Sequence, residues 1–446
     1  MPNMRSSARF RLSFLRRSEP DADDPAQTGS TGNLIWQLLG KVRKLGVAGS
    51  LKKLDEASKN TAFDAAVWAA SLFHKTGPDP RLEPPREILV LRPGDLGDLL
   101  TTTPIFEALR RRFPNARLIA GVGAWGRPIF ENNPFVDEIV TLDAPWCNNF
   151  VTESWGAALR FLFRSPQVNE LRRRGGLDAG IDILGVHFGS ALMLRLGVRH
   201  RIGVRGFRGG WRSCQHYARY SLQAHVTRTA LAQAELLGAA DLPDARPQIY
   251  LTATERAEAA RIWNEGPPAG AFQLLVGCGS AQPRKCWSAD SFAEALRQFS
   301  ATQKTGRPLN ILLLGGAADR ERANQIMAGA PAGTRALCGE TTLRVSFALV
   351  EQADLVLSNP SMLFHAAAAF RRPTVAVLYP LFADQDHDAI WGYPPPYRSV
   401  GPTNGAWASV EEVVAALLDS AHGGDPGTQR AVEMTAAVAP AIKCGS

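Results

Sequence analysis

The chain has 446 residues, of which 45% are hydrophobic and 21% are charged. This length exceeds the usual size of one domain and predicts two domains plus extensions. The net charge of +8 favours anionic partners such as nucleic acid, acidic lipid or a phosphorylated substrate. No stretch reaches the roughly 18 consecutive apolar residues that a membrane-spanning helix needs. These features favour a cytoplasmic protein that acts on an anionic partner.

The six cysteines lie far apart and form no CxxC pattern, which is typical of reduced thiols in a cytoplasmic chain. Cys278 and Cys286 have no His or Cys partner at zinc-like spacing, so no metal site is predicted.

Residues 1–80 are predicted to form an extension. Residues 18–33 are polar and rich in Pro, Gly, Ser and Asp, as mobile linkers are. From Leu34 to about His74, apolar residues recur at helical spacing with basic residues among them. Such a helix suits an anionic membrane surface, and it equally suits packing against the body of the protein.

A proline-rich boundary at residues 76–87 precedes a series of alternating strands and helices. Strands are expected over 87–94, 116–123, 136–143, 180–185 and 200–204, and helices over 99–113, 125–133 and 227–239. This alternation predicts a parallel sheet covered by helices on both faces.

A helix over 253–264 and a Gly/Pro break at 265–270 lead into a second series of the same kind. Strands are expected over 272–280, 354–359 and 373–380, helices over 288–300, 343–353, 362–370 and 409–420, and a strand–turn–helix over 309–329. The fold class is therefore α/β, with Rossmann-like domains at 81–265 and 266–422 and a disordered tail at 423–446. Ligands are expected outside the carboxyl ends of the strands.

The turn Gly94-Asp95-Leu96-Gly97-Asp98 lies between the first strand and a helix. It lacks the third glycine of the dinucleotide fingerprint and the Gly-Lys-Ser/Thr of a P-loop. Its two carboxylates would repel a diphosphate. Asp98 is either a helix N-cap or a carboxylate that takes a proton from a hydroxyl. Asp95 is interpreted as a solvated turn residue.

The stretch VGCGSAQPRKCW, residues 276–287, places Gly277, Gly279 and Ser280 at a strand exit, followed by Arg284 and Lys285. Free N–H groups beside two cations suit a diphosphate. An ordinary surface turn with solvated basic residues is the alternative interpretation.

Two further strand exits carry polar residues. Gly315 and Gly316 precede Asp319, which suits either ribose hydroxyls or the dipole of a helix N-terminus. Ser361 begins a helix after a strand, and His365 follows one turn later. A single histidine on such an alanine-rich helix commonly has a structural role.

Four segments in this order resemble glycosyltransferase family 9, whose best-known members are ADP-heptose:lipopolysaccharide heptosyltransferases. The resemblance runs from Ile88 to about Leu418 and rests on ILVLRPGDLGDLLTTTPIFEALRRRFPNARL, NPFVDEIVTLD, VGCGSAQPRKCWSADSFAEAL, and LCGETTLRVSFALVEQADLVLSN through HAAAAF.

The resemblance implies a GT-B fold, in which an acceptor-side domain and a nucleotide-sugar domain face each other across a cleft. It implies sugar transfer with inversion, no metal and no cofactor, because the ADP-linked sugar is itself a substrate. The partners implied are that nucleotide sugar and a glycolipid or surface-glycan acceptor. The basic amphipathic pattern after Leu34 adds an expected contact with anionic lipid at the inner face of the cytoplasmic membrane.

By motif position, Asp98 resembles the general base of the family and Lys285 the lysine that meets the donor diphosphate. Ser361 resembles part of the phosphate-binding turn, and Asp319 a residue near the nucleoside. The donor-binding set is Gly277, Gly279, Ser280, Lys285, Asp319, Ser361 and His365. The acceptor-side set is Arg92, Gly94, Gly97 and Thr101, and the metal-ligand set is empty.

The chain departs from the family pattern where Pro360 replaces an acid and Met362 replaces a glycine. A non-catalytic or altered-donor member that binds nucleotide sugar or glycan is therefore the alternative function. The stretch RHRIGVRGFRGGWR, residues 199–212, interleaves Arg with Phe and Trp, as nucleic-acid sites do. Nucleic-acid binding is not favoured, because a basic surface also suits a phosphorylated glycolipid acceptor.

Overall fold

The computed structural model describes residues 55–221, 224–266, 270–380, 387–402 and 405–422. The chain divides into two compact units. The first contains residues up to Asp95, Pro104–Arg127 and Pro134–Asp244, and the second contains Leu96–Thr103, Pro128–Asn133 and the residues from Ala245 onward. The predicted linker at 18–33, the predicted helix over 34–54 and the tail at 423–446 lie outside the described residues.

The first unit is built on a six-stranded sheet with the order β3-β2-β1-β4-β5-β6, in which every pair is parallel. Apart from the charged residues Glu87, Arg117 and Asp182 at their ends, the inner strands β1, β2 and β4 are apolar and buried, as strands of parallel sheets commonly are. The strands are β1 Glu87–Leu91, β2 Arg117–Val122, β3 Glu138–Thr141, β4 Ala179–Asp182, β5 His200–Arg205 and β6 His216–Arg219.

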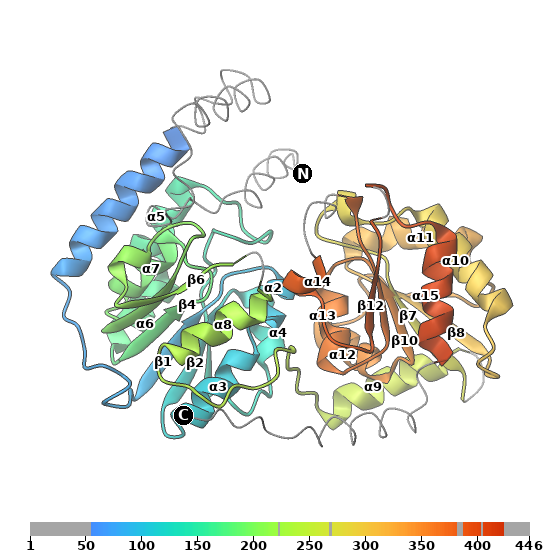
Figure 1. Ribbon diagram of the computed structural model, residues 1–446, viewed down its shortest axis with the longest axis horizontal. Helices are drawn as coiled ribbons and strands as arrows, with labels where there is room; N and C mark the ends of the chain where they lie inside the picture. The colour runs from blue at the N-terminus through green and yellow to red at the C-terminus, as the bar shows by residue number, and fades with distance from the viewer. Residues whose placement is uncertain (1–54, 222–223, 267–269, 381–386, 403–404, 423–446) are drawn as a thin grey trace, which may run out of the picture. The chain divides into compact units, whose positions relative to one another are not determined.

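Helices cover both faces of this sheet (Figure 1). On one face α3 packs against α8, and on the other α5 packs against α6 and α7. The aromatic core of the unit, with Trp146, Phe161 and Phe188, lies beneath the second group. The helices are α3 Pro104–Arg112, α5 Trp155–Arg164, α6 Pro166–Arg174, α7 His187–Arg195 and α8 Val226–Glu235, with short 3-10 turns at Ala124–Gly126 and Trp211–Ser213. Helix α4 Arg127–Phe130 begins at the last residue of this segment of the first unit and continues into a segment of the second unit.

The extension contributes a helix over residues 55–72, drawn in blue in Figure 1. The Phe63 ring contacts those of Trp155, His187 and Phe188 at centroid distances of 5.4, 5.6 and 5.1 Å. Val67 is buried one turn further on. Of the two interpretations of this region, packing on the body of the protein is therefore confirmed for residues 55–72.

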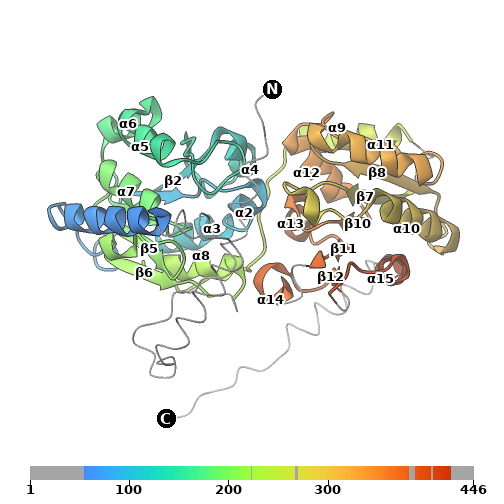
Figure 2. The ribbon, with the colours of Figure 1, turned by 90° about the horizontal axis from the view of Figure 1, so that it is seen from above.

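The second unit repeats the architecture with a parallel sheet in the order β12-β11-β10-β7-β8-β9. Figure 2 shows this sheet between its helices. Its strands are β7 Phe272–Gly277, β8 Leu309–Leu314, β9 Arg335–Ala336, β10 Leu355–Ser358, β11 Thr374–Val377 and β12 Tyr397–Val400.

The main core of this unit lies under α10, which packs between α11 and α15, while α12 packs between α9 and α13. The helices are α2 Leu96–Leu100, α9 Ala253–Asn264, α10 Ala289–Thr302, α11 Arg320–Gly329, α12 Leu343–Gln352, α13 Met362–Ala369, α14 His387–Trp391 and α15 Val410–His422, with 3-10 turns at Pro283–Lys285 and Ala317–Asp319.

Two short segments from early in the chain belong to this second unit. In the segment 96–103, the Thr103 hydroxyl accepts the N–H of Gln248 at 2.7 Å. In the segment 128–133, the carbonyl of Pro128 accepts from the Arg344 guanidinium at 3.0 Å. Arg344 also pairs with Glu255 at 2.8 Å and is almost fully buried. Both segments are therefore fixed by buried polar contacts.

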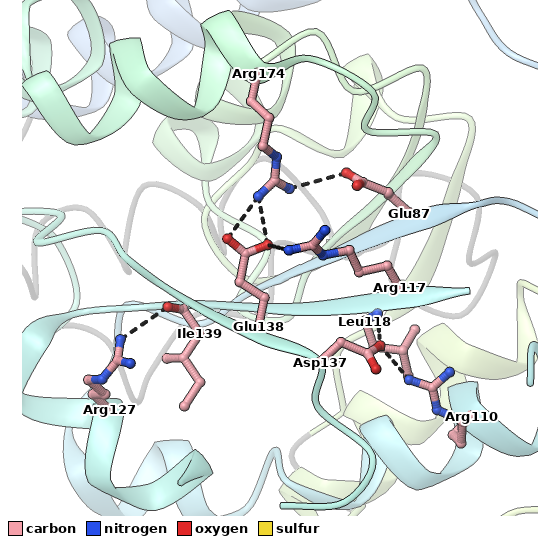
Figure 3. A network of polar contacts seen from close by, with 9 residues as sticks. All are labelled: Glu87, Arg110, Arg117, Leu118, Arg127, Asp137, Glu138, Ile139 and Arg174. Atoms are coloured by element: carbon pink, nitrogen blue, oxygen red, sulfur yellow. Dashed lines mark hydrogen bonds and ion pairs between the residues drawn. The ribbon is translucent and has the colours of Figure 1, made fainter. Parts of the chain in front are cut away.

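Arginine–carboxylate pairs join the strands of the first sheet at their amino ends (Figure 3). Glu138 pairs with Arg117 at 3.1 Å and with Arg174 at 2.6 Å, and Arg174 also reaches Glu87 at 3.1 Å. Arg117 and Arg174 therefore both have carboxylate partners. The network lies at the opposite edge of the sheet from the carboxyl ends, where ligands of such folds bind.

The helix expected over 99–113 is two helices, α2 and α3. The hydroxyls of Thr101 and Thr102 donate to the carbonyl of Asp98, and that of Thr103 donates to Leu100, so the threonines end the first helix. The prediction also omitted α5, α6, α7, α14, β6, β9 and β12.

Over the described ranges, no helix is both long enough and apolar enough to cross a membrane.

Candidate active site

Asp98 is the third residue of α2, so it lies within the first helical turn and not before it. The interpretation of Asp98 as the N-cap is therefore wrong, although a carboxylate in a first turn is still favoured by the helix dipole. The carbonyl of Asp98 accepts the hydroxyls of Thr101 and Thr102 at 2.8 and 2.9 Å. Thr101 is buried and its hydroxyl supports the backbone beneath Asp98.

The glycine before Asp98 lets α2 lie against α13. A Cβ at Gly97 would stand 3.1 Å from Cδ2 of His365 and 3.8 Å from Cα of Met362. A larger residue would press on the His365 ring, so glycine suits this close approach. Asp98 is therefore held beside the first turns of α13, the helix that begins after Ser361.

The basic turn after β7 is anchored by a buried asparagine that was not predicted. The Asn359 side-chain amide donates to the Cys278 carbonyl at 2.9 Å, and its carbonyl accepts the N–H of Trp287 at 2.9 Å. The backbone N–H of Asn359 donates to Gly277 at 3.2 Å. One side chain thus fixes both ends of the 277–287 segment.

Asp319 connects the two glycine turns of this sheet. Its carboxylate accepts the N–H of Gly316 at 2.9 Å, and a Cβ at Gly279 would overlap it. Burial raises the pKa of Asp319, while the Gly316 N–H and the nearby Arg322 oppose that rise. Glycine at position 279 leaves room for the Asp319 carboxylate, which is half-buried between turns that also suit a nucleotide.

Lys285 ends the 3-10 turn Pro283–Lys285, and its ammonium group lies 5.5 Å from the centre of the Tyr379 ring. A cation over an aromatic face gains electrostatic stabilisation. Arg284 differs, because it is exposed and donates to the Gln282 side chain of its own turn at 3.0 and 2.7 Å. Ser280, between the glycines and these cations, is half-buried.

Ser361 is the N-cap residue of α13, and its hydroxyl lies 3.3 Å from that of Ser358. Ser358 in turn fills the space over Gly277, where a Cβ would approach the Ser358 hydroxyl to 2.5 Å. Pro360 contributes no N–H at this point, so the first backbone donors of α13 begin at Ser361 itself.

His365 is buried, and its Nδ1 lies 2.7 Å from the Tyr393 hydroxyl. Burial raises the pKa of Tyr393 well above its usual value, so the hydroxyl keeps its proton and can donate it to Nδ1. A neutral His365 then carries its own proton on Nε2, which lies 3.5 Å from the position of a Cβ at Gly97. The histidine is thus oriented toward α2.

Two residues of the predicted acceptor-side set lie in the first unit. Arg92 is buried and its N–H donates to the Gly121 carbonyl at 3.0 Å. The carbonyl of Gly94 accepts the indole N–H of Trp125 at 2.9 Å. The structure therefore places Arg92 and Gly94 together at the carboxyl end of β1.

Asp95, interpreted as a solvated turn residue, is half-buried and has hydrogen-bond partners. Its carboxylate accepts the backbone N–H of Asn149 at 2.7 Å and the Asn149 side-chain amide at 2.9 Å. Local sequence gives no sign of this contact, because the partner is 54 residues away.

Sequence reasoning missed Asp182, the last residue of β4. It is fully buried, and its carboxylate accepts N–H groups of Val186 and Leu184 at 2.9 and 3.2 Å. Burial raises its pKa to about 6, against the opposing effect of these N–H groups and of Arg92. Asp182 lines a cavity of about 10 Å³ together with Trp146. An aspartate ending an apolar strand was the signal available.

Of the predicted residues, the second unit brings together the donor-binding set with Gly97, Asp98 and Thr101. Arg92 and Gly94 belong to the first unit. Within the ranges that the structure describes, no group of three or more His, Cys, Asp or Glu side chains is arranged to hold a metal ion.

Relatives with curated names are heptosyltransferases. Lipopolysaccharide heptosyltransferase 2 of Escherichia coli (strain K12) is 27% identical over 312 residues, which cover 67% of this chain and 84% of that protein. Lipooligosaccharide heptosyltransferase 2 of Haemophilus ducreyi is 24% identical over 303 residues, which cover 64% of this chain and 81% of that protein.

Solved structures share the fold. A family 9 glycosyltransferase of Veillonella parvula DSM 2008 has a TM-score of 0.62 at 19% identity, covering 76% of this chain and 97% of that one. The E. coli ADP-heptose lipopolysaccharide heptosyltransferase II has a TM-score of 0.58 at 21% identity, and the match covers 75% of this chain and 98% of that one. The predicted GT-B fold class is confirmed by this likeness.

Residues 169–413, more than half of the chain, match the family model described as Glycosyltransferase family 9 (heptosyltransferase). The chain therefore belongs to this family and is a glycosyltransferase.

Proposed function

We propose that this glycosyltransferase moves a heptose from ADP-heptose to a lipopolysaccharide core or a related cell-surface glycan. Transfer proceeds with inversion at the anomeric carbon and without a metal ion. The donor and acceptor are those in the names of the E. coli relatives. The observation that carries the proposal is the close approach of α2 to α13 at Gly97, which holds Asp98 beside the helix that begins at Ser361.

In the proposed reaction, the Asp98 carboxylate takes the proton of the acceptor hydroxyl. The acceptor oxygen then attacks the anomeric carbon from the face opposite the leaving group. The bond between that carbon and the phosphate oxygen of ADP breaks, and ADP leaves with the bonding electrons. Lys285 and the N–H groups at the start of α13 offset the charge that grows on the diphosphate.

Asp98→Asn tests this function, and Asp95→Asn is a matched control from the same turn. We expect Asp98→Asn to lower the rate of ADP release from ADP-heptose in the presence of acceptor by about 100-fold or more. Asp95→Asn should change it little, because the Asp95 carboxylate is occupied by Asn149. Equal rates for Asp98→Asn and the wild type would contradict the assignment of the base.

Two further measurements complete the test. The anomeric configuration of the product, determined by NMR, should be opposite to that of the donor. Excess chelator should leave the rate unchanged. Retention of configuration or a loss of rate that added metal restores would each reject that part of the proposal.

A second candidate function is nucleotide-sugar binding with an altered donor or without turnover. It is favoured by Pro360, which removes an N–H beside the phosphate turn, and by Met362 in place of glycine. Calorimetry with ADP, UDP and GDP sugars distinguishes the candidates. Binding of a different nucleotide sugar, or binding without release of free nucleotide, would support this function.

We also propose that the helix 55–72 makes peripheral contact with anionic lipid at the inner face of the cytoplasmic membrane. The helix 55–72 and the residue after it expose Trp68, Leu72 and Phe73, whose exposed fractions are 45%, 65% and 91%. Aromatic and leucine side chains on one helix face suit a bilayer interface. Replacing all three by Glu should abolish sedimentation with anionic vesicles, and unchanged sedimentation would reject the contact.

A further inference from the structure

The outer side of α5 exposes two apolar side chains. Ala158, Phe161 and Leu162 are buried, and their spacing of three and four residues places them on the inner side of the helix. Leu159 and Phe163 are four residues apart on the other side, where they expose 37% and 58% of their surface. Removing such apolar surface from water is favourable, so this side of α5 suits a partner with an apolar layer.

Arginines flank these apolar side chains. Arg160 and Arg164 directly follow Leu159 and Phe163 in α5. Arg172 and Arg173 are in the last turn of α6, the next helix, which packs against α5. All four arginine side chains are exposed, and none has a hydrogen-bond or ion-pair partner among the residues that the structure describes. Their positive charges are therefore available to an external anionic surface.

The two helices together are strongly basic. Residues 155–174 contain five arginines and one acidic residue, Glu170. The fifth arginine, Arg174, differs from the other four because it pairs with Glu138 and Glu87 (Figure 3). α5 and α6 belong to the helix layer on one face of the first sheet (Figure 1). Unpaired positive charge is therefore concentrated on this layer, whereas the charges at the amino ends of the strands are paired.

The helix 55–72 does not supply a positive charge of this kind. It contains Asp55, Glu56 and Asp64 and a single lysine, Lys59, so its charged side chains are mostly acidic. Acidic side chains are repelled by anionic headgroups. The apolar side chains that this helix exposes suit a bilayer, but a preference for anionic lipid needs basic side chains outside the helix.

An anionic bilayer suits α5 and α6 better than a nucleic acid does. A phosphate backbone would neutralise the arginines but would leave Leu159 and Phe163 in water. At a bilayer interface, leucine and phenylalanine enter the boundary between headgroups and acyl chains, while basic side chains of the same helix contact the headgroups. The long apolar stem of arginine reaches from that boundary to the phosphate groups. The combination of side chains therefore points to lipid.

We propose that the outer surface of α5 and α6 binds a bilayer that contains anionic phospholipid. This surface, here called the α5–α6 face, consists of the exposed apolar and unpaired basic side chains of the two helices: Leu159, Arg160, Phe163, Arg164, Arg172 and Arg173. The arginines bind lipid phosphates and set the preference for anionic lipid. The inference rests on the proposed function, because an enzyme with a glycolipid acceptor works at a membrane surface.

The test measures sedimentation of the full-length protein with phosphatidylglycerol vesicles and with phosphatidylcholine vesicles. We expect the wild type to bind phosphatidylglycerol at least about tenfold more tightly, because each basic side chain near an anionic bilayer contributes about fivefold. Arg160→Gln/Arg164→Gln/Arg172→Gln/Arg173→Gln should lower binding to phosphatidylglycerol by at least about tenfold and leave binding to phosphatidylcholine unchanged.

The matched control removes the same number of exposed arginines from elsewhere in the chain. These are Arg228, Arg261, Arg297 and Arg398, each replaced by Gln. The control variant has the same net charge as the test variant, so a difference between them reports the position of the charges. It should bind phosphatidylglycerol within about twofold of the wild type, because charges farther from the bilayer than the Debye length are screened.

The apolar side chains of the α5–α6 face have their own control. Leu159→Ser/Phe163→Ser should weaken binding to phosphatidylglycerol several-fold, because less apolar surface leaves water. Leu82→Ser should not, although Leu82 is 86% exposed. Circular dichroism spectra and melting temperatures like those of the wild type exclude misfolding as the cause. Wild-type binding by Leu159→Ser/Phe163→Ser would overturn the insertion of α5 into the bilayer.

The outcomes separate this inference from the proposed function. A wild-type preference for phosphatidylglycerol in the variant that lacks the four arginines would overturn the α5–α6 face. Tighter binding to single-stranded RNA than to phosphatidylglycerol vesicles would also overturn it. The measurements contain no sugar donor, so they do not depend on the reaction. Vesicle binding that needs the four arginines, in a protein without any sugar transfer, would support the α5–α6 face and reject the function.

Discussion

The turns after β1 and β7 have equivalent places in the two units and opposite charges. Each follows the first strand of its sheet in chain order, and each strand lies inside its sheet. In each, a buried asparagine amide donates to turn carbonyls: Asn148 to Pro93 at 3.4 Å and Asn359 to Cys278 at 2.9 Å. The backbone support is alike. The charge of each turn is therefore set by the few side chains that follow the glycines.

Those side chains divide the chemistry that we propose. The first turn presents carboxylates, and one of them, Asp95, is occupied by Asn149. The second presents Arg284 and Lys285 with no acid between Gly277 and Trp287. A carboxylate suits removal of a proton, and a cation suits a leaving diphosphate. Similar frameworks can thus support opposite halves of one reaction.

Removing Lys285, a cation of the second turn, should have the largest effect on the rate of the proposed reaction. Lys285→Ala is expected to lower kcat by about 100-fold, because a preorganised charge at a developing anion typically contributes that much. Arg284→Ala should lower it by less than about threefold, since Arg284 is exposed and bonded to Gln282. Steady-state kinetics with ADP-heptose checks both, and equal losses would mean that the two cations are interchangeable.

A methyl group at Gly279 should distort the second turn without changing its charge. The new Cβ would overlap the Asp319 carboxylate, so Gly279→Ala should destabilise the protein by about 2 kcal/mol and weaken ADP binding. Gly316→Ala is the matched control, because its Cβ would lie 3.8 Å from Asp319. Urea unfolding and ADP calorimetry distinguish the two, and equal stabilities would show that Asp319 moves freely.

The smallest expected effect concerns Asp182, a buried carboxyl group of the first unit. The pKa of Asp182 is raised to about 6 in the folded state, so the folded protein favours the protonated form of this carboxyl group. The contribution of the group to the free energy of unfolding is therefore lost as pH rises from about 4 to 6. Asp182→Asn should therefore gain stability relative to the wild type over that interval, by roughly 4 °C in Tm.

The difference in Tm between the two proteins isolates Asp182. The pKa of His200 is lowered to about 4 by burial, so its contribution rises with pH over the same range. His200 is present in both proteins, and its effect cancels in the difference. A difference in Tm that does not change between pH 4 and 7 would show that Asp182 is already ionised at pH 4.

The sequence predicted the parts of the site that depend on local pattern. Apolar runs followed by glycine identified β1, β7 and β8 and the turns after them. Pairing with distant residues was not predictable, because Asn359 and Asn149 give no local signal. The stretch LLTTTPIF kept a helical pattern across its threonines, although their hydroxyls bond back to the main chain and end α2.

The missed elements have physical reasons. α7 contains a glycine, Gly189, that lies against Asp182, and most of its residues are buried, so it lacks the polar stripe that marks a helix in sequence. β6 and β12 are edge strands with the sequences HYAR and YRSV, which lack the apolar runs that identified the inner strands. The predicted roles of Lys285, Asp319 and Ser361 came from the family resemblance and stay predictions.

The inclusion of residues 96–103 and 128–133 in the second unit limits how this gene can be recombined. A fragment that starts at Ala245 would lack Thr103 as the acceptor for Gln248, and it would leave the buried Arg344 without Pro128. A buried guanidinium N–H that loses its acceptor costs about 1–3 kcal/mol. Chimaeras that exchange the second unit between family members therefore need to carry these two short segments together with the carboxy-terminal half.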